Sequence, residues 1–286
     1  MTREHKLTAV GAILGGICAL LLTAVAHGAV PDERFREEFH QTYPLAATGR
    51  VSLENINGDV KITGWDRNEV KLDAVKSADE KEKLAKIEIR VDAQPDSIHI
   101  RTKYVDCENH GCNNPGSVEY TLMVPRGARL DAVKLINGTL NLDQISGEVN
   151  ASSINGRVNG TNLGGRIELS TINGEVNATL TPARVKSVAP VSLHSVNGRV
   201  EVTIPSDSSA ELSAHTVNGS IRNDFDLPVS HPRYGPGSRM EGRLADGGTK
   251  FELRTVNGSI AIRHAADGRP LSKATSLLPS DRSRMY

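Results

Sequence analysis

The sequence predicts an all-β protein, and within that class a β-solenoid of the single-stranded β-helix or β-roll-like type, with coils of about 18 residues, one short helix and inserted loops. Two observations support this prediction. A Gly-centred unit of nine residues repeats through the middle of the chain, and an Asn-Gly dipeptide occurs in alternate units. The composition agrees, since many of the 26 Gly residues follow Asn or precede a β-branched residue, as in a turn-rich β protein.

The nine-residue repeat is clearest between residues 136 and 178. In each unit the first residue is aliphatic, Gly follows at the third position, and further apolar or small residues occupy the fifth and seventh positions. These positions share one parity, so we expect each unit to form a short strand with one buried face, followed by a bend. The aliphatic residues that open the five units are Ile136, Ile145, Ile154, Leu163 and Ile172.

The Asn-Gly dipeptide indicates a structural repeat of 18 residues with two strands per coil. Stacked coils would place the Asn side chains above one another, where their amides can form a hydrogen-bonded ladder and Gly can adopt the positive φ that a bend needs. As an alternative, the same Asn residues would line a ligand groove. The seven candidate positions are Asn57, Asn137, Asn155, Asn173, Asn197, Asn218 and Asn257.

A second column of residues lies three positions before each Asn. If the coils stack in chain order, His194 and His215 are neighbours and could form a metal-binding or pH-sensitive pair. A solvated corner is the simpler interpretation of these positions. The column consists of Glu54, Lys134, Ser152, Ser170, His194, His215 and Arg254.

The segments outside the regular repeat also favour β-structure. Alternating residues on either side of 64–68 predict a hairpin, and the charged segment 77–86 predicts the short helix. The segment 223–248, rich in Pro and Gly, is expected to be a long surface excursion. Further alternating strands are expected at residues 86–92, 97–105, 117–124, 250–254 and 259–263.

The N-terminus is typical of a secretory signal peptide, which we assign to residues 1–28. Arg3 and Lys6 precede an uncharged run that ends in small residues. An uncleaved membrane anchor is the alternative, because this run is just long enough to cross a bilayer. We divide the remaining chain into a lead segment at 29–49, a β-solenoid domain at 50–264 and a tail at 265–286 that is expected to be disordered.

The exported chain would retain two cysteines, Cys107 and Cys112. In an oxidising compartment, a pair at this separation between Asn, Gly and Pro residues favours a disulfide that closes a loop. Two alternatives remain open: a metal site formed with His110 and Asp106, or free thiols. The metal site would be cramped, because all its ligands lie within seven residues and a second Cys pair is missing.

These features together resemble the DUF4097 family of putative adhesin domains, and are similar to the related head-GIN putative adhesins. The resemblance depends on the Asn-Gly-x-Val-x-Ile-x-Gly-Trp segment at 57–65, the charged helix, the strand that ends in Val124-Pro125, and the repeated Gly-x-Val units. It covers roughly residues 50–264. The resemblance implies an exported cell-envelope β-solenoid, and it carries over no catalytic or binding residue.

The composition and motifs argue against several classes of function. The chain has 34 basic and 34 acidic residues, whereas a nucleic-acid-binding protein normally has a basic surplus. No Gly-x-Ser-x-Gly, His-Glu-x-x-His or phosphate-loop motif is present, and no cofactor is expected. The sequence therefore predicts a non-enzyme in the periplasm or at the cell surface, which acts as a scaffold or adhesin toward an envelope protein or polymer.

Two other functions fit the sequence less well. A polysaccharide lyase or hydrolase could use carboxylates along a lateral groove, but no aromatic residue lies between Thr121 and Asp224 to stack on a sugar. A membrane-tethered envelope stress sensor would require the N-terminal segment to remain uncleaved. Only in that case is contact with a membrane expected.

Overall fold

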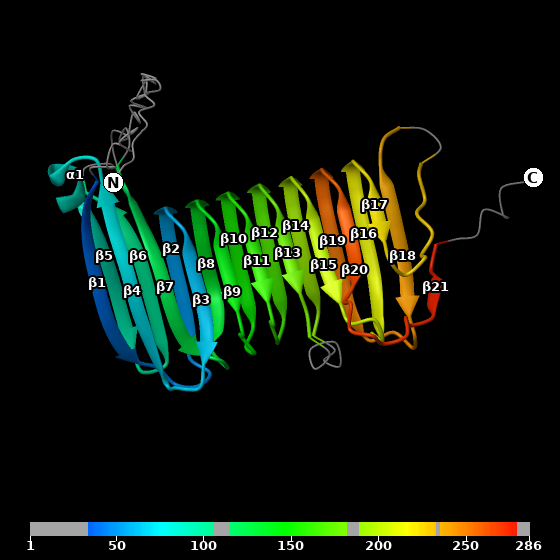
Figure 1. Cartoon of the computed structure of the whole chain (residues 1–286), viewed down its shortest axis with the longest axis horizontal. Helices are drawn as coiled ribbons and strands as arrows, with labels where there is room; N and C mark the ends of the chain where they lie inside the picture. Colours follow the sequence, from blue (N-terminus) through cyan, green and yellow to red (C-terminus); the bar gives the residue numbers. More distant parts are fainter. Residues whose placement is uncertain (1–33, 106–114, 182–188, 233–234, 279–286) are drawn as a thin grey trace, which may run out of the picture. The chain divides into compact units, whose positions relative to one another are not determined.

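The computed structural model describes residues 34–105, 115–181, 189–232 and 235–278. Nearly every element in these residues is a β-strand. The strands form two large sheets, which we name sheet A, with 10 strands, and sheet B, with 11 strands. Figure 1 shows the strands side by side in two layers. The prediction of an all-β protein is therefore confirmed.

Sheet A contains the shorter strand of each repeat. Its strands, in spatial order, are β1 (Phe35–Pro44), β4 (Glu69–Ala78), β7 (Ser117–Pro125), β3 (Val60–Trp65), β9 (Leu140–Asp143), β11 (Val158–Thr161), β13 (Val176–Thr179), β15 (Val200–Ile204), β20 (Ile260–His264) and β17 (Ile221–Asn223). The pairs β1–β4 and β4–β7 are antiparallel, and the remaining pairs are parallel.

Sheet B contains the longer strand that precedes each Asn-Gly. Its strands, in spatial order, are β21 (Ala274–Ser276), β18 (Ser238–Leu244), β16 (Ala210–Asn218), β19 (Thr249–Asn257), β14 (Val191–Asn197), β12 (Ile167–Asn173), β10 (Val149–Asn155), β8 (Arg129–Asn137), β2 (Arg50–Asn57), β6 (Ser97–Tyr104) and β5 (Ile87–Gln94). Antiparallel pairs occur only toward the two ends of this sheet, at β5–β6, β16–β18 and β18–β21.

Equivalent residues of successive repeats lie next to one another. Asn155 of β10 is in register with Asn137 of β8 and Asn173 of β12. The same offset aligns Val158 of β11 with Val176 of β13 in sheet A. Residues that are 18 positions apart in the sequence are therefore paired in register in neighbouring parallel strands.

The apolar residues that alternate along the strands form the core. In β10, Val149, Ala151 and Ser153 are buried, and in β11 Val158 and Gly160 are buried. The buried hydrophobic residues of the two sheets belong to one continuous cluster. Burial of this apolar surface is the main stabilising contribution to such a fold.

The predicted burial of the residues that open each unit was correct for only some of them. Ile145 and Leu163 are 0% and 1% exposed, but Ile136, Ile154 and Ile172 are 38%, 40% and 45% exposed. The reason is the corner at Asn-Gly, where the chain passes from sheet B to sheet A. Within β10 the alternation already turns Ile154 outward, and beyond the corner it restarts with the opposite parity, where Val158 is buried.

The predicted hairpin around residues 64–68 was wrong. Strands β3 and β4 do not pair with each other, because β7 lies between them. The turn residues and the alternation of the two strands are local features. They do not exclude a later strand that pairs with both.

Three further boundaries differ from the expectations. The helix α1 covers only Lys81–Ala85, because β4 extends to Ala78. The excursion at 223–248 contains β18, which pairs with β16. The lead segment contains β1, and the tail that we expected to be disordered contains β21, which pairs with β18. In each case tertiary pairing orders a segment that lacks the repeat.

Candidate functional site

The seven predicted Asn residues lie in one row along sheet B, whereas Asn159, which also precedes a Gly, lies in β11 of sheet A. Six of them donate a side-chain amide hydrogen to Oδ1 of a neighbour at 2.8–2.9 Å, whereas the amide of Asn57, at one end, donates to the Gly116 carbonyl oxygen at 3.3 Å. All six bonds have the same direction, so every interior Asn is both donor and acceptor. The order along the row is Asn57, Asn137, Asn155, Asn173, Asn197, Asn257 and Asn218.

A second, shorter row of amides lies in sheet A and was not anticipated. Asn159 donates to Asn141 at 2.9 Å, and Asn177 donates to Asn159 at 3.1 Å. Each of these residues follows the Asn of its Asn-Gly dipeptide by four positions. The same 18-residue spacing could have revealed this row in the sequence.

Hydroxyl groups beneath the first row tie neighbouring repeats together. The side chains of Thr171, Ser195, Thr255 and Thr216 each donate to a Gly carbonyl oxygen of the adjacent repeat at 3.0 Å. These carbonyls belong to the glycines that follow the ladder Asn residues. The close approach requires Gly, because a Cβ on Gly198 would overlap the carbonyl oxygen of Gly174.

The aliphatic residue before each of these Asn residues projects from the outer face of sheet B. The seven side chains are 36–45% exposed, and they lie on adjacent in-register strands. With strands about 4.8 Å apart, they form a row about 29 Å long. We call this row the aliphatic column; it consists of Ile56, Ile136, Ile154, Ile172, Val196, Val256 and Val217.

A continuous exposed row of aliphatic side chains is a feature of interaction surfaces, whereas single exposed hydrophobic residues need no explanation. Sequence reasoning missed the aliphatic column, because it assigned these residues to the buried face. The available signal was the Ile or Val that precedes each of the seven Asn residues of this row.

The residues three positions before each Asn lie on the same outer face, beside the aliphatic column. The predicted contact between His194 and His215 was wrong. Strand β19 lies between β14 and β16, so Arg254 is in register with both histidines and separates them. The pKa of His194 is lowered, mainly because burial disfavours its charged form.

A buried polar network fixes the first strands of this face. The Thr102 hydroxyl of β6 donates to Oδ1 of Asn55 in β2 at 2.8 Å, and lies 2.8 Å from the Tyr120 hydroxyl. The Asn55 amide donates to the carbonyl oxygen of Val118 at 2.9 Å. Because these groups satisfy one another away from water, they hold β2 and β6 in a fixed relation.

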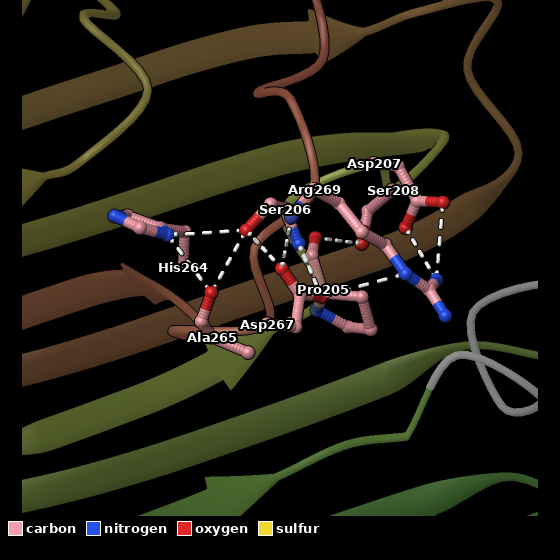
Figure 2. Close-up of polar contacts among 8 residues, drawn as sticks. All are labelled: Pro205, Ser206, Asp207, Ser208, His264, Ala265, Asp267 and Arg269. Carbon is pink, nitrogen blue, oxygen red and sulfur yellow. Dashed lines mark hydrogen bonds and ion pairs between the residues drawn. The ribbon is translucent and has the colours of Figure 1, made fainter.

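A Ser, a His and an Asp side chain converge where β15 and β20 end, and Figure 2 shows their contacts. The Ser206 hydroxyl lies 2.7 Å from Oδ1 of Asp267, 3.1 Å from Nδ1 of His264, and 2.8 Å from the carbonyl oxygen of Ala265. No repeat or motif in the sequence pointed to this cluster. Its residue types match those of a nucleophilic triad, so its geometry needs to be compared with that mechanism.

The geometry of the Ser206 cluster differs from that of a catalytic triad. Nδ1 of His264 is 2.9 Å from the Ala265 carbonyl oxygen, which can only accept, so Nδ1 carries the hydrogen and cannot take a proton from Ser206. Asp267 contacts the serine rather than the histidine, and Ser206 is 1% exposed. The hydroxyl is the main cause of the lowered pKa of Asp267. The cluster fastens the chain after β20 to the end of β15.

Several predicted features lie outside the described residues. These are the signal peptide at 1–28 and the loop with Asp106, Cys107, His110 and Cys112. Within the residues that the structure describes, no group of three or more His, Cys, Asp or Glu side chains is arranged to hold a metal ion. The same residues contain no helix long and apolar enough to cross a membrane.

No family model matches this chain, and the search of curated proteins found no match. Solved structures do resemble it. A crystal structure of a "putative cell adhesion protein" from Clostridium sporogenes matches with a TM-score of 0.50 and 13% identity, covering 82% of this chain and all 100% of the other. A "putative adhesin" from Bacteroides fragilis matches with a TM-score of 0.39 and 12% identity, covering 80% of this chain and 97% of the other. At this identity, the first likeness concerns the fold alone.

Proposed function

We propose that this chain is an exported cell-envelope protein with a β-solenoid fold and a non-catalytic, adhesin-like role, and that it binds its partner through the aliphatic column. The observation that carries the proposal is the column itself. Seven adjacent strands each expose one branched aliphatic side chain at the same register position. A solvent-facing strand position of a sheet would ordinarily carry polar residues.

The solenoid assignment is supported by the path of the chain. After each Asn-Gly the chain passes from sheet B to sheet A, as from β10 to β11, and it then returns to sheet B at β12. Equivalent strands lie side by side with an offset of 18 residues in the regular region. In such a fold the side chains of one register position form a straight row, which suits an extended contact.

The N-terminal sequence supports export, and a structural neighbour supports an adhesin-like role. The N-terminal segment has the pattern of a signal peptide. The neighbour with a TM-score of 0.50 is described as a "putative cell adhesion protein". A non-catalytic role is favoured by the geometry of Ser206, whose hydroxyl is buried and faces the protonated nitrogen of His264.

Binding of the native protein to isolated cell-envelope particles tests the proposal. Co-sedimentation of the wild type would be compared with that of a variant carrying both Ile172→Asp and Val196→Asp. Two carboxylates in the middle of the column should lower the bound fraction at least tenfold, because they place charge at an apolar contact. These side chains are exposed, so the variant should keep the wild-type melting temperature.

A matched control carries the same number of new charges on the other sheet. Thr161 and Thr179 are exposed in β11 and β13 of sheet A, and Thr161→Asp with Thr179→Asp should leave envelope binding unchanged. Equal binding by the column variant and the wild type would show that the column is not the binding surface.

A further inference from the structure

The outer face of sheet B is hollowed at the end where β2, β6, β8 and β10 meet. The groove has a volume of about 1000 Å³, which is within the range of small-molecule sites. Ile56, Ile136 and Ile154 of the aliphatic column line it. Three side chains of the column therefore lie in one hollow of this face.

Cationic side chains surround this aliphatic lining. Arg90, Arg101, Lys103 and Lys134 line the groove, whereas Glu54 is the one carboxylate among its described lining residues. Glu54 is already paired with Arg101 at 2.8 Å. Arg90 is likewise paired with Glu88 at 2.8 Å. Both guanidinium groups of this lining are therefore already engaged by carboxylates.

Lys134 differs from these two arginines. It is exposed on β8, in register with Glu54 of β2 and Ser152 of β10. In the described part of the chain, no ion pair within 4.0 Å involves its ammonium group. An anionic group in the groove could therefore approach Lys134 without displacing a carboxylate.

The spacing of the aliphatic lining limits what can lie along it. Side chains of the column repeat about every 4.8 Å, whereas those on one face of an extended peptide repeat about every 6.8 Å. A bound peptide would lose register with the column after a few residues. An acyl chain has no side chains to match, so it can follow the row at any position.

We propose that this groove binds an anionic lipid. Its phosphate group contacts Lys134, and its acyl chain lies over Ile136 and Ile154 toward Ile172. This proposal rests on the proposed function, since it names the chemistry of a partner for the same outer face. Lysine is a common phosphate ligand, and burial of the chain against aliphatic side chains supplies the remaining affinity.

Titration calorimetry with dodecyl phosphate, kept below its micelle concentration, tests the proposal on the full protein. Dodecyl phosphate should bind, whereas inorganic phosphate and the uncharged dodecyl maltoside should bind at least tenfold more weakly. Lys134→Glu and Ile136→Ser should each weaken the binding of dodecyl phosphate at least tenfold. Both side chains are exposed, so both variants should remain folded. Lys134→Glu should melt at a slightly lower temperature, because it places a carboxylate opposite Glu54 on the adjacent strand.

Two matched controls separate the groove from general charge and apolar effects. Lys61→Glu reverses an exposed charge in β3 of sheet A, and Val217→Ser removes an aliphatic side chain at the far end of the column. Neither should alter the binding of dodecyl phosphate. Equal affinity for dodecyl maltoside, or unchanged binding by Lys134→Glu, would overturn the proposal.

An acidic peptide containing Glu and Leu is the final comparison. If this peptide bound in a manner sensitive to Lys134→Glu while dodecyl phosphate did not bind, the groove would be a protein-binding site and the lipid assignment would be wrong. Ile172 and Val196 do not line the groove. If the Ile172→Asp, Val196→Asp variant lost envelope binding but dodecyl phosphate did not bind the wild type, only the lipid proposal would be rejected. If dodecyl phosphate bound as expected but that variant bound the envelope like the wild type, only the envelope-binding function would be rejected.

Discussion

The side-chain amide of Asn257 donates to Oδ1 of Asn197 at 2.8 Å, across 60 positions of the chain. Asn218, which lies between them in the sequence, donates to Asn257 from the other side. Strand β19 is therefore inserted between β14 and β16, and the order of the last two repeats is reversed. The row of amides remains continuous, because any strand that ends in Asn-Gly presents the same groups at the same register.

Removal of one interior Asn should weaken the fold measurably. Asn173→Ala removes the bond to Asn155 and the bond from Asn197. We expect the free energy of unfolding to fall by about 1–2 kcal/mol, since a net hydrogen bond contributes about 1 kcal/mol. Urea denaturation measures this change. Asn150→Ala, at an exposed position of β10 outside the ladder, is the control; an equal effect of both variants would show that the ladder does not stabilise the protein.

The corner glycines should tolerate no side chain. Gly198 has a φ of +155°, and a Cβ there would overlap the carbonyl oxygen of Gly174. Gly198→Ala should lower the free energy of unfolding by more than about 2 kcal/mol, because the backbone of two strands must separate. Gly268 has a φ of +69° but faces open space, so Gly268→Ala should cost about 1 kcal/mol. Chemical denaturation measures both changes. Equal losses of unfolding free energy in Gly198→Ala and Gly268→Ala would show that the contact with the Gly174 carbonyl oxygen does not require Gly.

Two equivalent serines should respond differently to the loss of their hydroxyl groups. Ser195 donates to the Gly174 carbonyl oxygen at 3.0 Å, whereas the buried Oγ of Ser153 has no hydrogen-bond partner. Ser195→Ala should lower the free energy of unfolding by about 1–2 kcal/mol. Ser153→Ala should leave it unchanged or raise it, because it removes an unsatisfied buried group. A comparable loss in both variants would contradict this distinction.

The Ser206 cluster should make stability depend on pH in the acid range. The hydrogen bond from Ser206 lowers the pKa of Asp267, so the folded state favours the ionised carboxylate. This contribution is present above the ordinary Asp value of about 3.9, and it is lost as the pH falls through the lower folded pKa. At pH 7 the wild type should have a higher melting temperature than Asp267→Asn, and the difference between the two melting temperatures should shrink toward pH 3. A constant difference would indicate an effect unrelated to ionisation.

The local sequence pattern predicted that these segments are strands, but it did not predict all the pairs that the strands form. The 18-residue spacing correctly gave the register of Asn155 and Asn173. It opened strands at Ile154 and Ile172, whereas these residues lie near the ends of β10 and β12 and the corner follows them. The hairpin and the contact between His194 and His215 were wrong, because each was inferred from order along the chain. Pairing by β7 and β19 brings in strands that are distant in sequence, and no local feature excludes it.

The sequence by itself determined the all-β class, the 18-residue repeat and the row of Asn residues, because these depend on spacing and on which residues permit a corner. Only the tertiary structure decided which aliphatic side chains are exposed. Ile145 is buried and Ile154 is exposed, although both open a repeat unit. The alternation within β10 turns Ile154 outward, and beyond the corner at Asn-Gly the parity is reversed, so that Val158 is buried. The spacing in the sequence extended the parity of Val158 back across this corner and therefore assigned Ile154 to the core.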